Sequence, residues 1–213
     1  MWCIVVAGGS GTRYGAAKQY VELAGAPVLH HSVAVAADAV DGVVVVLPRG
    51  DVATVVPKAD VVVAGGDTRS ASVRAGLAAV PAEVQIVLVH DAARPNASLE
   101  LFRAVIDAVE AGADAAVPGV PVSDTIRHLD GGVVDRSQLV AVQTPQAFRA
   151  EALHRAHAAG GDATDDAGLV EAAGGRVVIV PGERSNLKLT EPADLVVLEA
   201  LRAERARSAR MEP

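Results

Sequence analysis

Residues 1–13 read MWCIVVAGGSGTR, a short apolar run that ends in a glycine-rich segment. Similar runs, most of them rich in valine, recur at residues 43–47, 60–64, 84–89, 113–117 and 176–180. Continuous apolar runs of this length are typical of strands that are buried on both faces, as in a parallel sheet. The first run is therefore expected to be a strand, and the glycine-rich segment the loop that follows it.

Helical patterns lie between these runs. Leu99, Phe102, Ile106 and Val109 fall on one stripe of a helix, and Ser98 is its expected N-cap. Further helices are expected from about residue 68, over 151–159, over 165–173 and after residue 192. The alternation of strands and helices predicts an α/β fold, in which a mostly parallel, twisted sheet carries helices on both faces and functional loops at the carboxyl ends of its strands.

Composition excludes several classes of protein. With 213 residues, 51% of them hydrophobic and 21% charged, the chain is expected to form one globular domain over residues 1–213. A formal net charge of −7 argues against nucleic acid or an anionic membrane as the main partner. The single cysteine, Cys3, excludes an internal disulfide framework. No stretch of about 18 apolar residues is present, and the first seven residues lack a basic leader, so we expect a cytoplasmic protein with neither membrane span nor signal peptide.

The strand–helix alternation stops near Pro118. Within residues 119–142, two extended pieces at 123–129 and 133–134 flank Asp130-Gly131-Gly132, a sequence typical of a hairpin turn. An isolated hairpin of this size is marginally stable in water, so we expect it to pack on another surface. That surface is either a second subunit, with 119–142 acting as a dimerisation arm, or the body of the same chain.

The glycine loop after the first expected strand allows three interpretations. A P-loop would end in Gly-Lys-Ser/Thr, and no such triplet occurs. A dinucleotide-binding loop would need glycine where Tyr14 stands, and an acidic residue after the second strand, where the chain has Leu47-Pro48-Arg49. The third interpretation is a phosphate-binding loop, because glycines let backbone N–H groups approach a phosphate, and Arg13 and Lys18 add the positive charge that a triphosphate requires. A plain turn with two solvated cations is the structural alternative.

Two further polar segments follow expected strands. In Gly65-Gly66-Asp67-Thr68-Arg69-Ser70-Ala71-Ser72, the glycines can admit a planar base, and Asp67 and Ser72 can bind polar edges of a base or ribose; alternatively, Asp67 or Thr68 only caps a helix. In His90-Asp91-Ala92-Ala93-Arg94-Pro95, a lone carboxylate at a strand end suits Mg²⁺, and Arg94 can bind a second anionic group. The alternative is an ion pair between Asp91 and Arg94 that fixes the loop.

Taken in order, these segments resemble the cytidylyltransferases that make CDP-linked polyol phosphates, above all the 2-C-methyl-D-erythritol 4-phosphate cytidylyltransferases of the non-mevalonate isoprenoid pathway. The resemblance covers nearly the whole chain. It includes Lys18-Gln19-Tyr20, Ser123-Asp124-Thr125, Val134-Asp135-Arg136, Gln143-Thr144-Pro145-Gln146, Thr164-Asp165-Asp166 and Asn186-Leu187-Lys188.

The resemblance implies a Rossmann-like nucleotidyltransferase fold, CTP and a polyol phosphate as substrates, Mg²⁺ as cofactor, and a homodimer in which a protruding β-arm embraces the partner. The residues that it assigns to the nucleotide are Ala7, Gly8, Gly9, Gly11, Arg13 and Lys18 around the phosphates, Gly66, Asp67, Arg69 and Ser72 around the cytidine, and Asp91 and Ala92, with Asp91 as the metal ligand. Those that it assigns to the polyol phosphate are Arg94, Thr125, Arg136, Thr164 and Asp165, several of them from the partner's arm. The residues that it implies for catalysis are Arg13, Lys18, Arg136 and Lys188.

Rival functions stay open at this point. The loop Gly-Gly-Ser-Gly-Thr-Arg also occurs in sugar-nucleotide transferases, so ribitol 5-phosphate or another sugar phosphate is an alternative acceptor. A nicotinamide-dependent oxidoreductase is disfavoured by the missing glycine and acid. A nucleotide-sensing module is disfavoured because Arg13, Lys18 and Asp91 occur together, and sensing needs no transition-state charge. We expect His90 to support the Asp91 loop and assign no chemistry to the other histidines.

Overall fold

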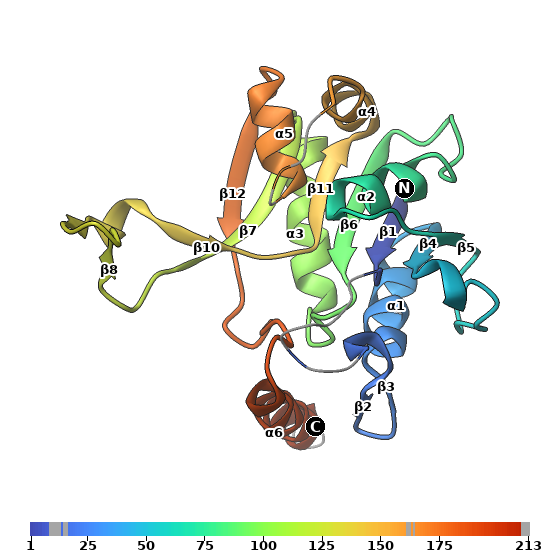
Figure 1. Ribbon diagram of the computed structural model, residues 1–213, viewed down its shortest axis with the longest axis horizontal. Coiled ribbons are helices and arrows are strands. Elements are labelled where there is room, and N and C mark those ends of the chain that lie inside the picture. The colour runs from blue at the N-terminus through green and yellow to red at the C-terminus, as the bar shows by residue number, and fades with distance from the viewer. Residues whose placement is uncertain (9–13, 15–16, 161–162, 164, 210–213) are drawn as a thin grey trace.

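The computed structural model describes residues 1–8, 14, 17–160, 163 and 165–209. Within these residues the main sheet has eight strands (Figure 1). Seven of them follow the order β10-β7-β11-β6-β1-β4-β5, and the eighth, β12, pairs with β7. The strands are β1 (Trp2–Val6), β4 (Gly42–Leu47), β5 (Val61–Ala64), β6 (Ile86–Asp91), β7 (Ala115–Pro121), β10 (Val140–Val142), β11 (Gln146–Arg149) and β12 (Val177–Pro181).

Most neighbouring strands of this sheet are parallel. The pairs β1–β4, β1–β6, β4–β5 and β7–β12 are parallel, whereas β11 runs antiparallel between β6 and β7, and β10 pairs antiparallel with the end of β7. The six parallel strands coincide with the six apolar runs, so the predicted α/β fold is confirmed. Patterns in the sequence did not indicate β10 and β11.

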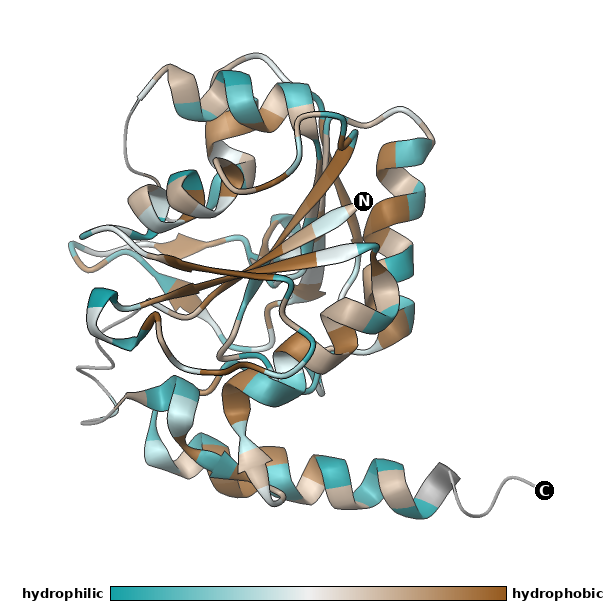
Figure 2. Ribbon diagram, turned by 90° about the vertical axis from the view of Figure 1, so that its right-hand side faces the viewer, coloured by the Kyte–Doolittle hydropathy of each residue, from teal (hydrophilic) through white to brown (hydrophobic). Residues whose placement is uncertain are grey.

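Helices cover both faces of the sheet (Figure 2). Alternate residues of β1 show why: Cys3 and Val5 belong to the core cluster that contains α1 (Val28–Ala39) and α3 (Leu99–Glu110). Ile4 belongs to the opposite cluster, with α2 (Arg69–Leu77), α4 (Ala150–Ala158) and α5 (Asp166–Ala172). Both faces of the sheet are therefore buried, as its uninterrupted apolar runs predict.

Side chains cap the starts of α3 and α5, and of these two caps only that of Ser98 was expected. Ser98 accepts a hydrogen bond from the Leu101 N–H at the start of α3, and Asp165 accepts one from the Gly168 N–H at the start of α5. The last helix, α6 (Pro192–Ala209), begins at the expected proline. It packs through Leu198 against the short ribbon of β2 (Glu22–Leu23) and β3 (Ala26–Pro27). Neither this ribbon nor α1 was expected from the sequence.

The hairpin in residues 119–142 projects from the body of the molecule (Figure 1). Its strands, β8 (Ile126–Arg127) and β9 (Val133–Val134), pair only with each other among the described residues. Gly131 and Gly132 have φ angles of 114° and 83°, which a side chain rarely adopts, so the turn depends on glycine as predicted. Leu129 and Val133 are exposed.

Candidate active site

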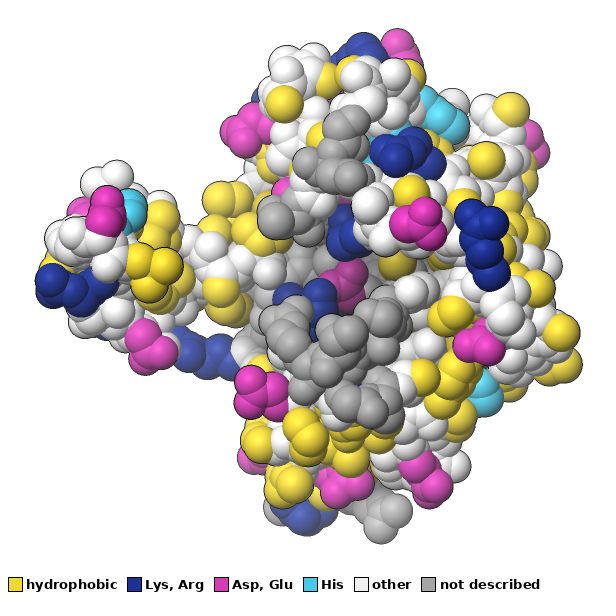
Figure 3. Space-filling model, in the orientation of Figure 1, with side chains coloured by type: hydrophobic (Ala, Val, Ile, Leu, Met, Phe, Trp, Pro, Cys, Tyr) yellow, Lys and Arg dark blue, Asp and Glu magenta, His cyan; other side chains and the backbone are white. Residues whose placement is uncertain are grey.

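A cavity of about 470 Å³ opens at the carboxyl ends of β1 and β6, where an α/β sheet usually binds its ligands. Its walls come from the segment after β1, from the 3₁₀ turn Lys18–Tyr20, from the start of α2 and from the segment after β6. Figure 3 shows a hollow in the middle of one face, with acidic and basic side chains in it. Of the residues predicted for the site, those that line this cavity are Ala7, Gly8, Lys18, Gly66, Asp67, Arg69, Ser72, Asp91, Ala92 and Lys188.

A second cavity of about 310 Å³ adjoins the first. Arg69, Asp91 and Lys188 line both cavities and so form the wall between them. The second cavity also contains Arg94 and Asp165, two residues predicted to bind the polyol phosphate. The structure therefore brings together two spaces that share one carboxylate and two cations.

Asp91 is the centre of this shared wall. Its Oδ2 lies 2.6 Å from the Lys188 Nζ, and its Oδ1 lies 3.6 Å from the Arg69 Nε. Burial alone would raise the pKa of Asp91, but Lys188, Arg69 and Arg94 outweigh it and hold the pKa far below its usual range. The carboxylate is thus ionised and attracts positively charged groups. The described ion pairs of Asp91 are with Lys188 and Arg69, so the alternative of an Asp91–Arg94 ion pair is wrong.

Arg69 forms an ion pair with a buried aspartate, Asp166. Its NH1 donates to the Asp166 Oδ2 at 2.7 Å, and the other oxygen of Asp166 lies 3.0 Å from the His157 Nε2. Asp166 and His157 are both buried. This chain of contacts directs the guanidinium of Arg69 toward Asp91, so its place is at the wall between the cavities.

The start of α2 shapes the first cavity. Thr68 caps the helix by accepting a hydrogen bond from the Ala71 N–H at 3.1 Å, whereas Asp67 lines the cavity. The Ser72 hydroxyl accepts from the Gly66 N–H at 3.2 Å and donates to the Thr68 carbonyl at 3.0 Å. A Cβ on Gly66 would lie 2.5 Å from the Cβ of Ala71, so packing against α2 is enough to require this glycine.

Gly8 differs from Gly66 in this respect. Among the described residues the atom nearest to a Cβ on Gly8 is the Ser72 Oγ, at 3.4 Å, an ordinary contact distance. Gly8 lines the cavity. The described packing therefore leaves room for one added methyl group at Gly8.

The loop that carries Asp91 is fixed by buried polar groups. The Asp91 N–H donates to the Thr144 hydroxyl at 2.9 Å, and this hydroxyl lies 3.1 Å from the His90 Nδ1. The Ser32 hydroxyl donates to the Ala92 carbonyl at 2.8 Å. Burial lowers the pKa of His90 to about 4, so its ring is neutral where it contacts Thr144. His90 thus supports the Asp91 loop, as expected.

Two other predicted residues lie on the arm. Thr125 and Arg136 are exposed on the arm and line neither cavity of their own chain; the Arg136 guanidinium donates to the Ser123 carbonyl. Asp165 caps α5 and accepts from the Gln146 Nε2 at 3.3 Å. Gly9, Gly11, Arg13 and Thr164 lie outside the described residues.

Sequence reasoning assigned no role to several residues of the site. Thr144 and Gln146 line the second cavity, and Asp166 holds Arg69. The polar run Gln143-Thr144-Pro145-Gln146 was a signal for the first two, because it interrupts two apolar segments. Asp166 carried no such signal. The residue before it, Asp165, is also a carboxylate, and the sequence alone does not tell which of the two lines the cavity.

The site can supply a protein ligand to a Mg²⁺ ion that also binds phosphates, but its described residues do not form a complete set of protein ligands for a metal. No group of three or more His, Cys, Asp or Glu side chains arranged for metal binding occurs in the described part of the chain. Asp91 supplies one ionised carboxylate where the two cavities meet. Mg²⁺ commonly binds one or two carboxylates and completes its shell with phosphate oxygens and water, so the residues present fit it.

Comparison with known proteins decides the family. Residues 1–204 match the model of the IspD family, described as 2-C-methyl-D-erythritol 4-phosphate cytidylyltransferase. The chain belongs to the IspD family. The family match confirms the resemblance found in the sequence. It disfavours the oxidoreductase, the nucleotide sensor and the alternative acceptors.

Individual members of the IspD family are similar along almost their whole length. A 2-C-methyl-D-erythritol 4-phosphate cytidylyltransferase of Rubrobacter xylanophilus is 44% identical over 96% of this chain and 95% of its own. One of Rhodococcus jostii is 45% identical, over 95% of each chain. The crystal structure of the enzyme from Thermus thermophilus superposes with a TM-score of 0.81 at 38% identity, over 93% of this chain and 97% of that one. None of the helices in the described residues is both long and apolar enough to cross a membrane.

Proposed function

We propose that this protein transfers a cytidylyl group from CTP to 2-C-methyl-D-erythritol 4-phosphate, giving 4-CDP-2-C-methyl-D-erythritol and pyrophosphate, a step in isoprenoid precursor biosynthesis by the non-mevalonate pathway. Family membership supports the reaction. The observation that carries the proposal is the wall of Asp91, Lys188 and Arg69 between two cavities, because the reaction joins two phosphates at one point.

The reaction needs little proton transfer. An oxygen of the acceptor's phosphate monoester attacks the α-phosphorus of CTP, a new P–O bond forms, and the bond from the α-phosphorus to pyrophosphate breaks. The monoester is largely a dianion at neutral pH, so no general base is required. The barrier comes from bringing one anion onto another, and positioning and charge neutralisation lower it.

The first cavity suits CTP. We infer that Ala7, Gly8 and Lys18 contact its phosphates, together with Gly9, Gly11 and Arg13. The residues inferred to surround the cytidine are Gly66, Asp67 and Ser72, and Ala92 lines the same cavity. Arg69, which the resemblance assigns to the cytidine as well, lies beside Asp91 at the wall between the cavities. Lys18 lines this cavity, which supports its role with the phosphates.

The second cavity suits the acceptor phosphate. Arg94 and Asp165 line it, and we infer that Thr164 belongs to the same set. Lys188 and Arg69 lie where the attacking oxygen and the α-phosphate would meet, so they neutralise charge on both. Asp91 would hold Mg²⁺, which when bound supplies further positive charge to the triphosphate. The Lys188 ammonium, whose side chain is 40% exposed, can then turn from Asp91 toward the phosphates.

We further infer a homodimer in which the arm of one subunit reaches the second cavity of the other. Thr125 and Arg136 lie too far out on the arm to line their own site, and apolar side chains at its base and tip are exposed: Leu129, Val133, Leu139, Val140 and Val142. Covering that apolar surface would stabilise a dimer. Location in the cytoplasm stays a prediction from the sequence.

Pyrophosphate release tests the proposal. Purified protein is given CTP, Mg²⁺ and, in separate reactions, 2-C-methyl-D-erythritol 4-phosphate, ribitol 5-phosphate or a sugar 1-phosphate. We expect rapid release with the first acceptor and release at least about a hundredfold slower with the others, since a polar site discriminates strongly against misplaced hydroxyls. Faster release with ribitol 5-phosphate would contradict the proposed acceptor, and no release with any acceptor would contradict the reaction.

A further inference from the structure

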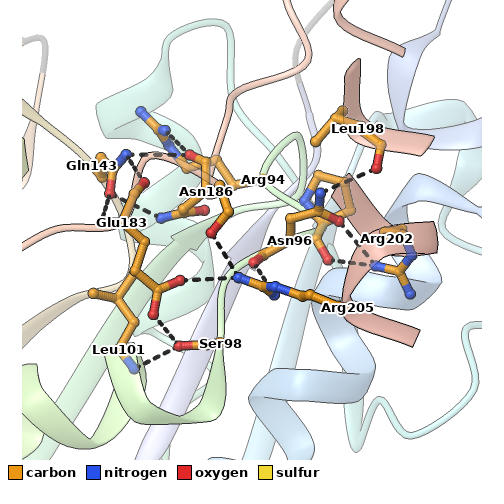
Figure 4. Close-up of polar contacts among 12 residues, drawn as sticks. Arg94, Asn96, Ser98, Leu101, Gln143, Glu183, Asn186, Leu198, Arg202 and Arg205 are labelled. Carbon is orange, nitrogen blue, oxygen red and sulfur yellow. Dashed lines mark hydrogen bonds and ion pairs between the residues drawn. The ribbon is translucent and has the colours of Figure 1, made fainter. Parts of the chain in front are cut away.

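Lys188 lies on a segment that contains neither helix nor strand. This segment, residues 182–191, connects β12 to α6. Without a ladder of backbone hydrogen bonds, its conformation depends on contacts with side chains from other elements. The contacts near Lys188 are made by buried amides and an arginine (Figure 4).

Gln143 binds this segment as a neighbouring strand would. Its Nε2 donates to the Glu183 carbonyl at 2.8 Å, and its Oε1 accepts from the Glu183 N–H at 3.1 Å. The same Oε1 accepts from the Asn186 Nδ2 at 3.3 Å. Gln143 is buried, so water does not compete for these hydrogen bonds.

Asn186 extends these contacts toward the cavities. It is fully buried, and its side-chain Nδ2 donates to the Thr144 backbone carbonyl at 2.9 Å. The backbone carbonyl of Asn186 accepts from the Arg94 NH1 at 2.8 Å. On the other side of Lys188, the Leu189 N–H donates to the Ala93 carbonyl at 2.8 Å. Lys188 is thus fixed two residues before and one residue after its own position.

Thr144 connects both members of the central ion pair. Its hydroxyl accepts from the Asp91 N–H, and its carbonyl accepts from Asn186. The contacts that place the Asp91 carboxylate and those that place the Lys188 ammonium therefore meet at one residue. Displacing Asn186 would change the position of Lys188 relative to Asp91.

The far end of the segment has separate anchors. Arg205 of α6 donates to the Glu183 carboxylate at 3.3 Å and to the Ser185 hydroxyl at 2.7 Å, and Ser98 donates to the same carboxylate (Figure 4). Arg205 lines neither of the two cavities. It provides a matched control, because it holds the same segment without holding the residues next to Lys188.

We propose that Gln143 and Asn186 form a clamp that positions Lys188 and Arg94 at the wall between the two cavities. The inference rests on the proposed function, which assigns both cations to the phosphates. The clamp residues are positioning residues: they act through Lys188 and Arg94 by fixing the backbone that carries Lys188 and the guanidinium of Arg94.

The test is a double-mutant cycle between Gln143→Met, which keeps size and removes the amide, and Lys188→Met. Single-turnover pyrophosphate release is measured with CTP, Mg²⁺ and 2-C-methyl-D-erythritol 4-phosphate. We expect Gln143→Met alone to slow release about ten- to a hundredfold, as loss of the outer partners of functional groups commonly does, with the KM for CTP changed less than about twofold. In the Lys188→Met background the same substitution should cause a clearly smaller loss, because only the effect that the clamp has through Arg94 then remains.

Arg205→Met is the control and should change release by less than about twofold, since it leaves the clamp intact. Asn186→Ala repeats the cycle and replaces it if Gln143→Met does not fold. Equal losses from Gln143→Met in both backgrounds, or equal losses from Arg205→Met and Gln143→Met, would overturn the clamp. Absence of release by the unmodified protein would instead count against the proposed function.

Discussion

Lys188→Met is the substitution that most directly separates catalysis from folding at this site. Methionine retains much of the aliphatic stem of lysine and removes the charge. In the structure the ammonium lies 2.6 Å from the Asp91 carboxylate, whose side chain is 12% exposed. Removing it leaves Asp91 with Arg69 as its remaining ion-pair partner among the described residues, 3.6 Å away.

The cost to stability should be modest. Breaking a fully buried ion pair costs about 3 to 5 kcal/mol, whereas exposed pairs contribute about 1 kcal/mol or less. The Lys188 side chain is 40% exposed and Arg69 remains, so we expect a loss of about 1 to 2 kcal/mol in the free energy of unfolding. For a chain of this size that corresponds to a fall of about 2 to 8 °C in the midpoint of thermal unfolding.

The cost to catalysis should be larger. Removal of one preorganised group that stabilises transition-state charge typically lowers kcat about a hundred- to a thousandfold, or about 3 to 4 kcal/mol. The assay is single-turnover pyrophosphate release at saturating CTP and acceptor, at a temperature where the variant is folded. Lys58→Met is the matched control, because the Lys58 Nζ lies 2.7 Å from the Asp38 Oδ1 on the surface, with both side chains more than half exposed.

The control should retain normal activity and lose less than about 1 kcal/mol of stability. A loss of activity below about tenfold in Lys188→Met would refute the reasoning, because such a loss is too small for a group that neutralises charge in the transition state. The same conclusion would follow if Lys58→Met lost as much activity as Lys188→Met.

Three further predictions concern other parts of the site. Gly8→Ala should weaken CTP binding, measured by calorimetry, with little change in thermal stability, whereas Gly66→Ala should lower thermal stability because its methyl would meet α2; the reverse pattern would contradict both assignments. Lys18→Ala should lower turnover about a hundredfold, and mixing it with inactive Arg136→Ala should restore activity through heterodimers; no recovery after verified subunit exchange would argue against a shared site. Asp91→Asn should raise the Mg²⁺ concentration needed for half-maximal pyrophosphate release, and an unchanged Mg²⁺ dependence would exclude Asp91 as the ligand.

The sheet could be predicted largely from the sequence because its central parallel strands are buried on both faces. Such strands need apolar residues at every position, and β4 is the plainest case, with all six residues buried. The antiparallel strands β10 and β11 differ from these strands in length, burial or composition. All three residues of β10 are apolar but exposed, and the strand is short; β11 begins with the buried amide of Gln146 and ends with Arg149, so neither strand gives the long apolar run of a buried parallel strand. Their pairing with β7 and β6 depends on contacts made only in the fold.

The candidate site was predictable to the extent that its residues follow strands. Ala7 and Gly8 follow β1, and Asp91 ends β6, so the rule that loops at carboxyl ends carry function brings them together. Lys188 follows no strand end directly and was found through its resemblance to family members. Its partner Asp91 lies 97 residues earlier in the chain, a separation that no local pattern reports.

Asp165 and Asp166 show where prediction from sequence ends and why. Two adjacent carboxylates at the start of a helix look equivalent in the chain, since either is favourable near a helix N-terminus. In the fold, Asp165 is the N-cap and lines the second cavity, whereas Asp166 is fully buried and pairs with Arg69 and His157. A helix turns by about 100° per residue, so neighbouring side chains face different surroundings. Which of them meets the ligand is decided by how α5 packs on α4, β7 and β12. Arg69, the ion-pair partner of Asp166, lies 97 residues earlier in the chain, so no local pattern reports the pairing.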